Sequence, residues 1–104
     1  MDGSVFSAIA DPTRRAILDM LRVEELRAGE LAARFPVSRP AIAKHMRVLR
    51  RAGLVCERRQ AQARLYSLDP AALTMVDQWL APYRLFWNAR LVDLKHAIES
   101  SSGS

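Results

Sequence analysis

Cysteine, histidine and glycine are all scarce in this chain of 104 residues. The single cysteine, Cys56, excludes an intramolecular disulfide and agrees with a reducing compartment. With two histidines and four glycines, the sequence has no glycine-rich phosphate loop and no nucleophile beside a suitable base. We therefore expect neither enzymatic activity nor a cofactor.

Long apolar runs are also missing. No segment approaches the roughly 18 consecutive apolar residues of a membrane span, and the N-terminus lacks the pattern of a signal peptide. We expect a cytoplasmic protein with no membrane partner. Half of the residues are hydrophobic, enough for one core, so residues 1–99 are predicted to form one domain. Residues 100–104 contain only Ser and Gly and are predicted to be a disordered tail.

Positive charge is concentrated in the middle of the chain. The net charge is +5, yet residues 34–64 alone carry nine basic residues against one acid, Glu57, which gives this segment +8. The remaining residues are therefore mildly acidic. A cationic segment between acidic flanks is typical of a surface that binds a polyanion.

Apolar spacing and capping residues predict four helices in the first half. A short helix around residues 5–9 ends at Asp11, which caps a second helix that begins at Pro12 and runs to about residue 22. A third helix is expected over residues 28–35. Ser38 then caps a fourth helix, which is expected to end near residue 53.

The fourth helix is predicted to have two different faces. Ile42, Met46 and Leu49 recur at helical spacing on one face. The cations Lys44, Arg47 and Arg51 recur at the same spacing on another. The pattern indicates one buried face and one exposed cationic face.

Residues 54–59 and 64–68 favour short β-strands, which predict a two-stranded hairpin. Because neither Gly nor Asn marks the link between them, we expect a connection longer than a two-residue turn. The predicted fold class is mainly α with a small β-hairpin, a winged helix-turn-helix. Its parts are a helix-turn-helix over 28–52, a wing over 54–68 and a C-terminal helix over 70–99.

In the C-terminal helix, apolar residues alternate at three- and four-residue steps, close to a heptad pattern. We call this set the α-seam; it contains Leu73, Val76, Leu80, Tyr83, Trp87, Leu91, Leu94 and Ile98. Pro82 lies within it and is expected to kink or break the helix.

A helix-turn-helix with a cationic second helix and a basic hairpin is typical of proteins that bind double-stranded DNA, because an α-helix fits the major groove. Arg39 could pair with guanine and Ala41 could contact a thymine methyl, while the later arginines are placed for phosphates. The predicted DNA-binding residues are Ser38, Arg39, Ala41, Lys44, Arg47, Arg51, Arg59 and Arg64.

Six short motifs follow one another in a fixed order along the chain. They are Asp11-Pro12-Thr13-Arg14-Arg15, Gly29-Glu30-Leu31-Ala32, Val37-Ser38-Arg39-Pro40-Ala41, Lys44-His45, Leu49-Arg50-Arg51-Ala52-Gly53-Leu54-Val55 and Leu65-Tyr66-Ser67-Leu68. As an ordered set they resemble the ArsR/SmtB family of winged-helix repressors. The resemblance implies a homodimer joined by the first and last helices. It also implies an autoregulatory repressor that binds a palindromic operator and that a signal releases from DNA. The expected dimer contacts are Val5, Phe6, Ile9, Leu80, Tyr83, Trp87, Leu91 and Leu94.

The chain departs from this family where many members bind metals. Ala32 and Arg34 occupy the places of the family's metal-binding cysteines, and in the last helix only Asp93 and His96 share a face. The sequence therefore resembles the subgroup without metal ligands, and no metal is expected.

Several alternatives stay open at this point. They are a metal- or redox-responsive repressor of the same fold, a winged-helix protein-interaction module, an activator, and a regulator with an unidentified small-molecule effector. The aromatic residues of the last helix suit either a dimer core or a pocket for such an effector.

Overall fold

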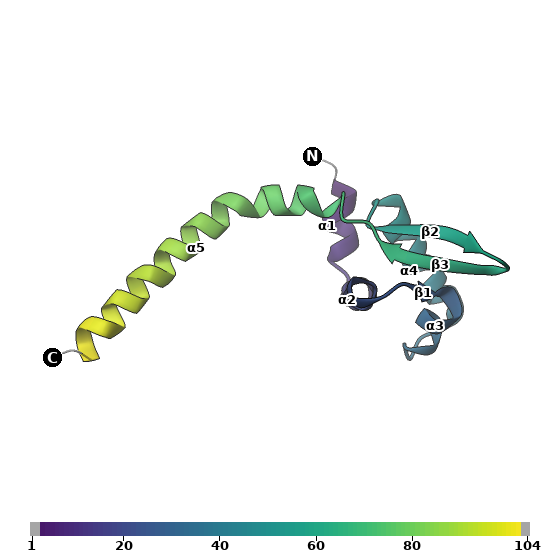
Figure 1. Cartoon of the computed structure of the whole chain (residues 1–104), viewed down its shortest axis with the longest axis horizontal. Coiled ribbons are helices and arrows are strands. Elements are labelled where there is room, and N and C mark those ends of the chain that lie inside the picture. Colours follow the sequence, from purple (N-terminus) through teal and green to yellow (C-terminus); the bar gives the residue numbers. More distant parts are fainter. Residues whose placement is uncertain (1–2, 103–104) are drawn as a thin grey trace.

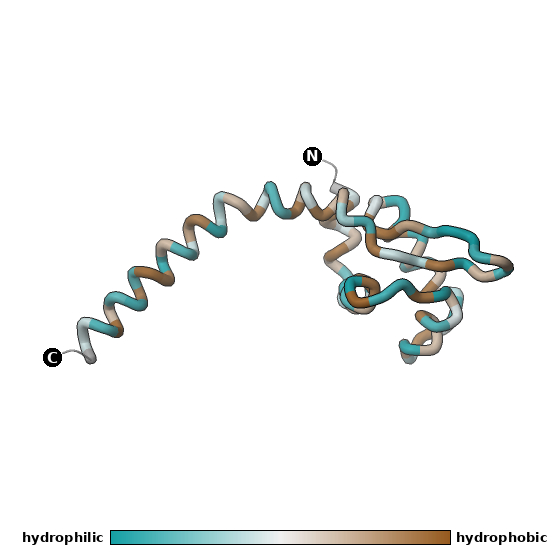
Figure 2. Tube along the Cα trace, in the orientation of Figure 1, coloured by the Kyte–Doolittle hydropathy of each residue, from teal (hydrophilic) through white to brown (hydrophobic). Residues whose placement is uncertain are grey.

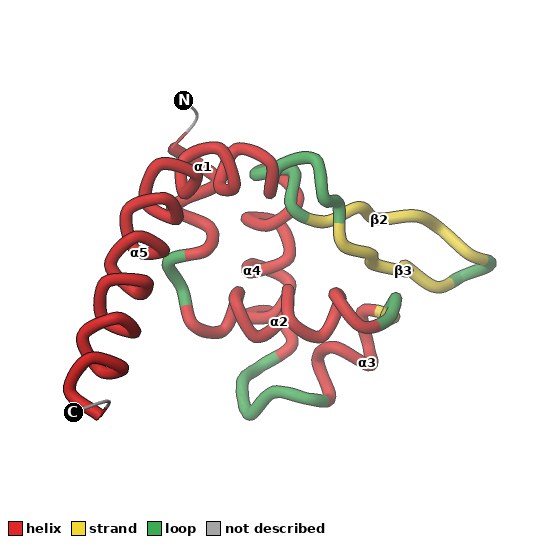
Figure 3. Tube along the Cα trace, turned by 60° about the vertical axis from the view of Figure 1, so that its left-hand side comes forward, coloured by secondary structure: helices red, strands yellow, loops and turns green. Residues whose placement is uncertain are grey.

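The computed structural model describes residues 3–102, and Figure 1 shows a folded body from which one long helix leads away. The elements in chain order are α1 (Gly3–Ile9), α2 (Pro12–Val23), β1 (Leu26–Arg27), α3 (Ala28–Ala33), α4 (Arg39–Arg51), β2 (Val55–Gln60), β3 (Ala63–Leu68) and α5 (Leu73–Ser102). The mainly helical fold with a small antiparallel sheet confirms the predicted fold class. The hairpin β2–β3 projects beyond the helices (Figure 3).

Two predicted caps fix where helices begin. The Asp11 carboxylate accepts a hydrogen bond from the backbone amide of Arg14 at 3.0 Å, at the start of α2. The Ser38 hydroxyl oxygen accepts one from the amide of Ala41 at 3.3 Å, at the start of α4. Each cap satisfies an amide that has no partner within its own helix.

The core lies between α1, α2, α3, α4 and the sheet. Its buried residues are Val5, Ala8, Ile17, Leu21, Leu26, Leu31, Ile42, Met46, Leu49, Ala52, Leu54, Val55 and Tyr66. Three of them form the predicted apolar face of α4, which is confirmed.

The position of Val5 corrects one expectation. The sequence predicts Val5 in a contact between protomers, but its side chain is 2% exposed and belongs to the core of the single chain. The reason is that α1 turns this side toward α2 and α4. Phe6 lies beside it at the base of α5, where its ring meets that of Trp79 edge-on with centroids 5.7 Å apart.

The sheet has three antiparallel strands in the order β1-β3-β2. The strand outside the predicted hairpin, β1, is only two residues long, and its Leu26 pairs with Tyr66 of β3. So short a strand has no periodicity, which is why the sequence predicts only a hairpin. The strand matters because it fastens the base of the wing to the core.

The turn of the wing is also tighter than predicted. Gln60 pairs with Ala63, so only Ala61 and Gln62 connect the strands. Ala61 supplies the positive φ, 56°, that such a turn requires. The expectation of a longer connection is therefore wrong, because alanine takes a conformation usually given to glycine.

The last helix is continuous through Pro82 and bends along its length, so Pro82 does not break it (Figure 1). It also continues through residues 100–102, which the sequence predicts to be disordered. Each added residue of a formed helix gains a hydrogen bond, and the Ser101 hydroxyl donates to the Ala97 carbonyl at 2.7 Å. Residues 103 and 104 of the predicted tail lie outside the described residues.

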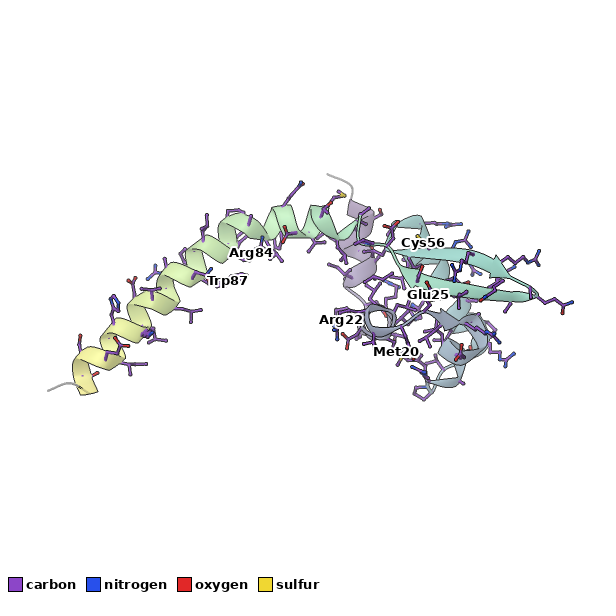
Figure 4. All side chains as sticks on the ribbon, in the orientation of Figure 1. Met20, Arg22, Glu25, Cys56, Arg84 and Trp87 are labelled. Atoms are coloured by element: carbon purple, nitrogen blue, oxygen red, sulfur yellow. The ribbon has the colours of Figure 1, made fainter. Side chains whose placement is uncertain are left out.

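Most of α5 has no other element beside it. Figure 2 shows hydrophobic residues recurring along it to its C-terminal end, and Figure 4 shows Trp87 on this isolated part. Its exposed large hydrophobic residues are Trp79, Tyr83, Leu85, Phe86, Trp87, Leu91, Val92, Leu94 and Ile98. Within residues 3–102, no helix combines the length and the hydropathy needed to cross a membrane.

Replacing Ala61 with glycine is expected to raise the free energy of unfolding by up to about 1 kcal/mol, because glycine adopts positive φ without strain from a Cβ atom. At the next turn position, Gln62→Gly is expected to lower it by about 0.5 kcal/mol, since there the substitution only adds freedom to the unfolded chain. Chemical denaturation of both variants measures the two effects. Destabilisation by Ala61→Gly would contradict the turn geometry.

Candidate nucleic-acid interface

The cationic face of α4 is exposed. At 100° per residue, Lys44, Arg47 and Arg51 lie on the side of the helix opposite its buried apolar face. All three side chains are exposed, whereas the apolar residues of α4 are buried. The structure therefore brings these three predicted DNA-binding residues together on one surface, which we call the outer face of α4.

Two other predicted residues of α4 lie elsewhere. Arg39 falls on the side of the helix that faces the wing, where it lines a pocket of about 210 Å³ together with Ala43 and Arg64. Ala41 is half-buried on the opposite flank. Arg39, Ala41 and Lys44 therefore do not share one face. Ser38, which caps α4, is exposed at the start of the helix.

The two predicted wing residues are neighbours. Arg59 and Arg64 are paired across β2 and β3, so their side chains leave the same face of the hairpin. Glu57 and Tyr66 form the next pair on this face. Because Tyr66 is buried and Val55 on the same face is also buried, this is the inner face of the wing, turned toward α4.

Glu57 is the residue that the sequence interpretation misses. Its side chain is 15% exposed, forms an ion pair with Arg50 at the end of α4, and lies 3.3 Å from Nε of Arg64. The Tyr66 hydroxyl donates to the same carboxylate at 3.4 Å. Burial, and then the negative charge of Glu57, raise the pKa of Tyr66, so this hydroxyl stays protonated.

Four of the nine basic side chains in residues 34–64 are engaged in ion pairs. Besides Arg50 and Arg64, Arg34 pairs with Glu24 at 3.3 Å and Arg58 with Glu25 at 2.9 Å. Glu25, labelled in Figure 4, approaches Arg58 on the outer face of the wing. Among the described residues, the basic side chains of this segment for which the structure shows no ion pair are Arg39, Lys44, Arg47, Arg51 and Arg59. Within the described part of the chain, the charges of these five side chains are not offset by an acid, and Arg50 and Arg64 share the single charge of Glu57.

Arg14 of α2 fixes α4 against α1. Its guanidinium donates to the backbone carbonyls of Ala8 at 2.7 Å and Ser7 at 3.1 Å, at the end of α1. Its remaining nitrogen lies 3.2 Å from Nδ1 of His45 on α4. One side chain thus joins three helices, and the sequence gives no sign of this beyond the presence of Arg14 in a motif.

The structure also bears on the metal and redox alternatives. Within residues 3–102, no group of three His, Cys, Asp or Glu side chains is placed to hold a metal ion. The Sγ atom of Cys56 lies 3.5 Å from the Asp69 carboxylate. Desolvation and this carboxylate raise the pKa of the Cys56 thiol, which disfavours the reactive thiolate.

An apolar cleft of about 520 Å³ lies on the far side of α2. Its apolar lining comes mainly from Ile9, Leu18, Leu68 and Leu73. No aromatic residue of α5 lines this cleft, which therefore differs from the effector pocket that the sequence offers as an alternative to a dimer core.

Comparison with known proteins gives consistent matches. A family model for a helix-turn-helix domain matches residues 9–58. The HTH-type transcriptional regulator Rv2034 of Mycobacterium tuberculosis is 42% identical over 91% of this chain and 86% of its own length. The transcriptional repressor SdpR of Bacillus subtilis is 39% identical over 74% of this chain and 86% of its own length. A solved ArsR-like transcriptional regulator from Rhodococcus sp. RHA1 is 37% identical, covers 90% of this chain and 89% of its own, and superposes with a TM-score of 0.70.

Replacing Asp11 with asparagine is expected to keep the helix cap but to remove a pH dependence. The backbone amide of Arg14 holds the pKa of Asp11 below its usual value. A depressed pKa contributes stability that is present above the unfolded-state value, near 3.8, and is lost as the pH falls through the folded-state value.

Urea denaturation of the wild type and of Asp11→Asn, at neutral pH and at about pH 3, measures this contribution. The wild type should lose more stability than the variant on acidification. Equal losses would show that the Asp11 charge is not linked to folding.

Proposed function

The chain belongs to the ArsR/SmtB family of winged helix-turn-helix transcriptional regulators, and from that premise we propose that it acts as a homodimeric repressor that reads a palindromic operator with α4. The observation that carries the proposal is the outer face of α4, where Lys44, Arg47 and Arg51 are exposed opposite a fully buried apolar face. A helix of this kind fits the major groove, about 12 Å wide, and its cations neutralise phosphates on both sides.

We assign roles along this surface by position. Lys44 contacts base edges from the outer face of α4, and Arg39 reaches them from the flank that faces the wing. Ala41, on the other flank, meets a thymine methyl group. Ser38 and the amides of the first turn are placed at a phosphate. Arg47, Arg51, Arg59 and Arg64 hold the sugar-phosphate backbone, the last two from the wing.

The proposed dimer interface is the exposed part of the α-seam with Phe6 and Ile9. From residue 83 onward the seam has only solvent beside it, because α5 leaves the body of the chain (Figure 1). Burial of apolar surface contributes about 25 cal/mol per Å², so a second copy that covers the seam stabilises both helices. Two copies would present two α4 helices about 34 Å apart, the spacing of successive major grooves.

We also propose that the repressor is cytoplasmic, regulates its own gene, and is released by a signal that changes the dimer. The surroundings of Cys56 do not favour a redox signal. The basic outer face of α4 favours DNA over a protein-interaction module, which has no need of such a surface.

Replacing Arg47 with alanine is expected to weaken binding to every DNA duplex and to reduce the salt slope by about one unit, because one phosphate contact is lost. Arg22→Ala is the matched control, because it removes the same charge from α2 (Arg22 is labelled in Figure 4). There Arg22 pairs with Asp19 at 3.0 Å. Fluorescence anisotropy with labelled duplexes over a salt series measures both variants. Equal slopes for Arg47→Ala and the wild type would contradict the proposed DNA contact.

Replacing Leu91 with lysine is expected to raise the dissociation constant of the dimer about 100-fold, since symmetry places the change twice in the interface at about 1.5 kcal/mol each. Leu85→Lys is the control: Leu85 is 75% exposed, against 58% for Leu91, but lies on a different side of α5. Sedimentation equilibrium measures both. If Leu85→Lys were monomeric and Leu91→Lys stayed dimeric, the proposed interface would be on the wrong face of α5.

A further inference from the structure

Glu57 lies where the reading helix and the wing meet. It belongs to β2, yet its carboxylate contacts Arg50 of α4 and Arg64 of β3, which lie on different elements. The carboxylate therefore joins three elements. A charged group with only 15% of its side chain exposed is costly unless it is paired, and here two guanidinium groups and the Tyr66 hydroxyl satisfy it.

The two arginines contact Glu57 on their inner side, and the rest of each guanidinium is exposed to solvent. Their side chains are 49% and 62% exposed, whereas that of Glu57 is 15% exposed. Each guanidinium has five N–H donors in a rigid fork, so the contact with Glu57 leaves donors that face solvent. With Arg59 they line a cleft of about 390 Å³ whose floor carries Glu57.

This cleft has the composition of a phosphodiester site. Three arginines and one carboxylate leave a net charge of +2, and the arginine fork matches the oxygens of a phosphate. Because one arginine comes from α4 and two from the wing, a single phosphate in the cleft would be held by both elements.

We propose that Glu57 is a positioning residue for DNA binding: it holds Arg50 and Arg64 as a pair around one backbone phosphate, which fixes the wing relative to α4. The inference rests on the proposed function, since it requires α4 and the wing to contact the same duplex. Fixed phosphate contacts set the register of the reading helix on DNA, so Glu57 serves discrimination between sequences and not affinity in general.

Charge and positioning give opposite expectations for Glu57→Gln. By charge alone, loss of an acid strengthens binding to all DNA. If Glu57 positions the arginines, binding to random DNA still strengthens, but binding to the preferred sequence falls because two arginines lose their orientation. The ratio of the two affinities separates these effects.

The experiment uses the full chain and a duplex enriched from random DNA by in vitro selection with the wild type, beside a scrambled duplex of equal composition. Glu57→Gln is expected to lower the affinity ratio about tenfold. Glu25→Gln is the matched control, because it removes the same charge and frees Arg58 on the outer face of the wing. Its ratio should equal that of the wild type.

A second comparison keeps Glu57 in place in case Glu57→Gln does not fold. Arg50→Ala and Arg64→Ala should each lower the ratio, and the double variant should lower it by less than the product of the two effects, because both arginines act on one phosphate. Independent effects of Arg50→Ala and Arg64→Ala, or equal ratios for Glu57→Gln and Glu25→Gln, would overturn this inference and leave the proposed function standing. A wild type that enriches no duplex would overturn the proposed function and this inference with it.

Discussion

Burial of the apolar face of α4 is the constraint on which the rest of the structure depends. Ile42, Met46 and Leu49 are all in the core, so the rotation of the helix about its own axis is fixed. Lys44 and Arg47 must then face outward, since they lie on the opposite side of the same helix. One helix therefore serves the core and the interface together, and any change that turns it in the core also changes what it presents to DNA.

Much of the fold could be predicted from local signals. The capping side chains of Asp11 and Ser38 mark the starts of α2 and α4 because a cap acts over three residues of sequence. The predictions that failed concern contacts between residues distant in sequence, or an unusual backbone conformation. Periodicity shows that Val5 is on an apolar face but not which surface covers it. It also cannot reveal a two-residue strand or an alanine at positive φ, as at Ala61.

The same division holds for the candidate site. Helical spacing alone groups Lys44, Arg47 and Arg51, and the structure places them together on the outer face of α4. Glu57 appears in the sequence only as the one acid of a basic segment, because its partners are brought to it by the pairing of β2 with β3 and by the packing of α4. Arg50 and Arg64 are held in place by this carboxylate, whereas the arginines on the outer face of α4 have no such partner among the described residues.

In the proposed complex, two copies of α4 read one DNA site. Hydroxyl-radical footprinting of the purified chain on genomic fragments that it recovers tests this most directly. We expect two protected patches related by a two-fold axis, with centres about 34 Å apart along the duplex. A single protected patch, or no protection on any recovered fragment, would contradict it.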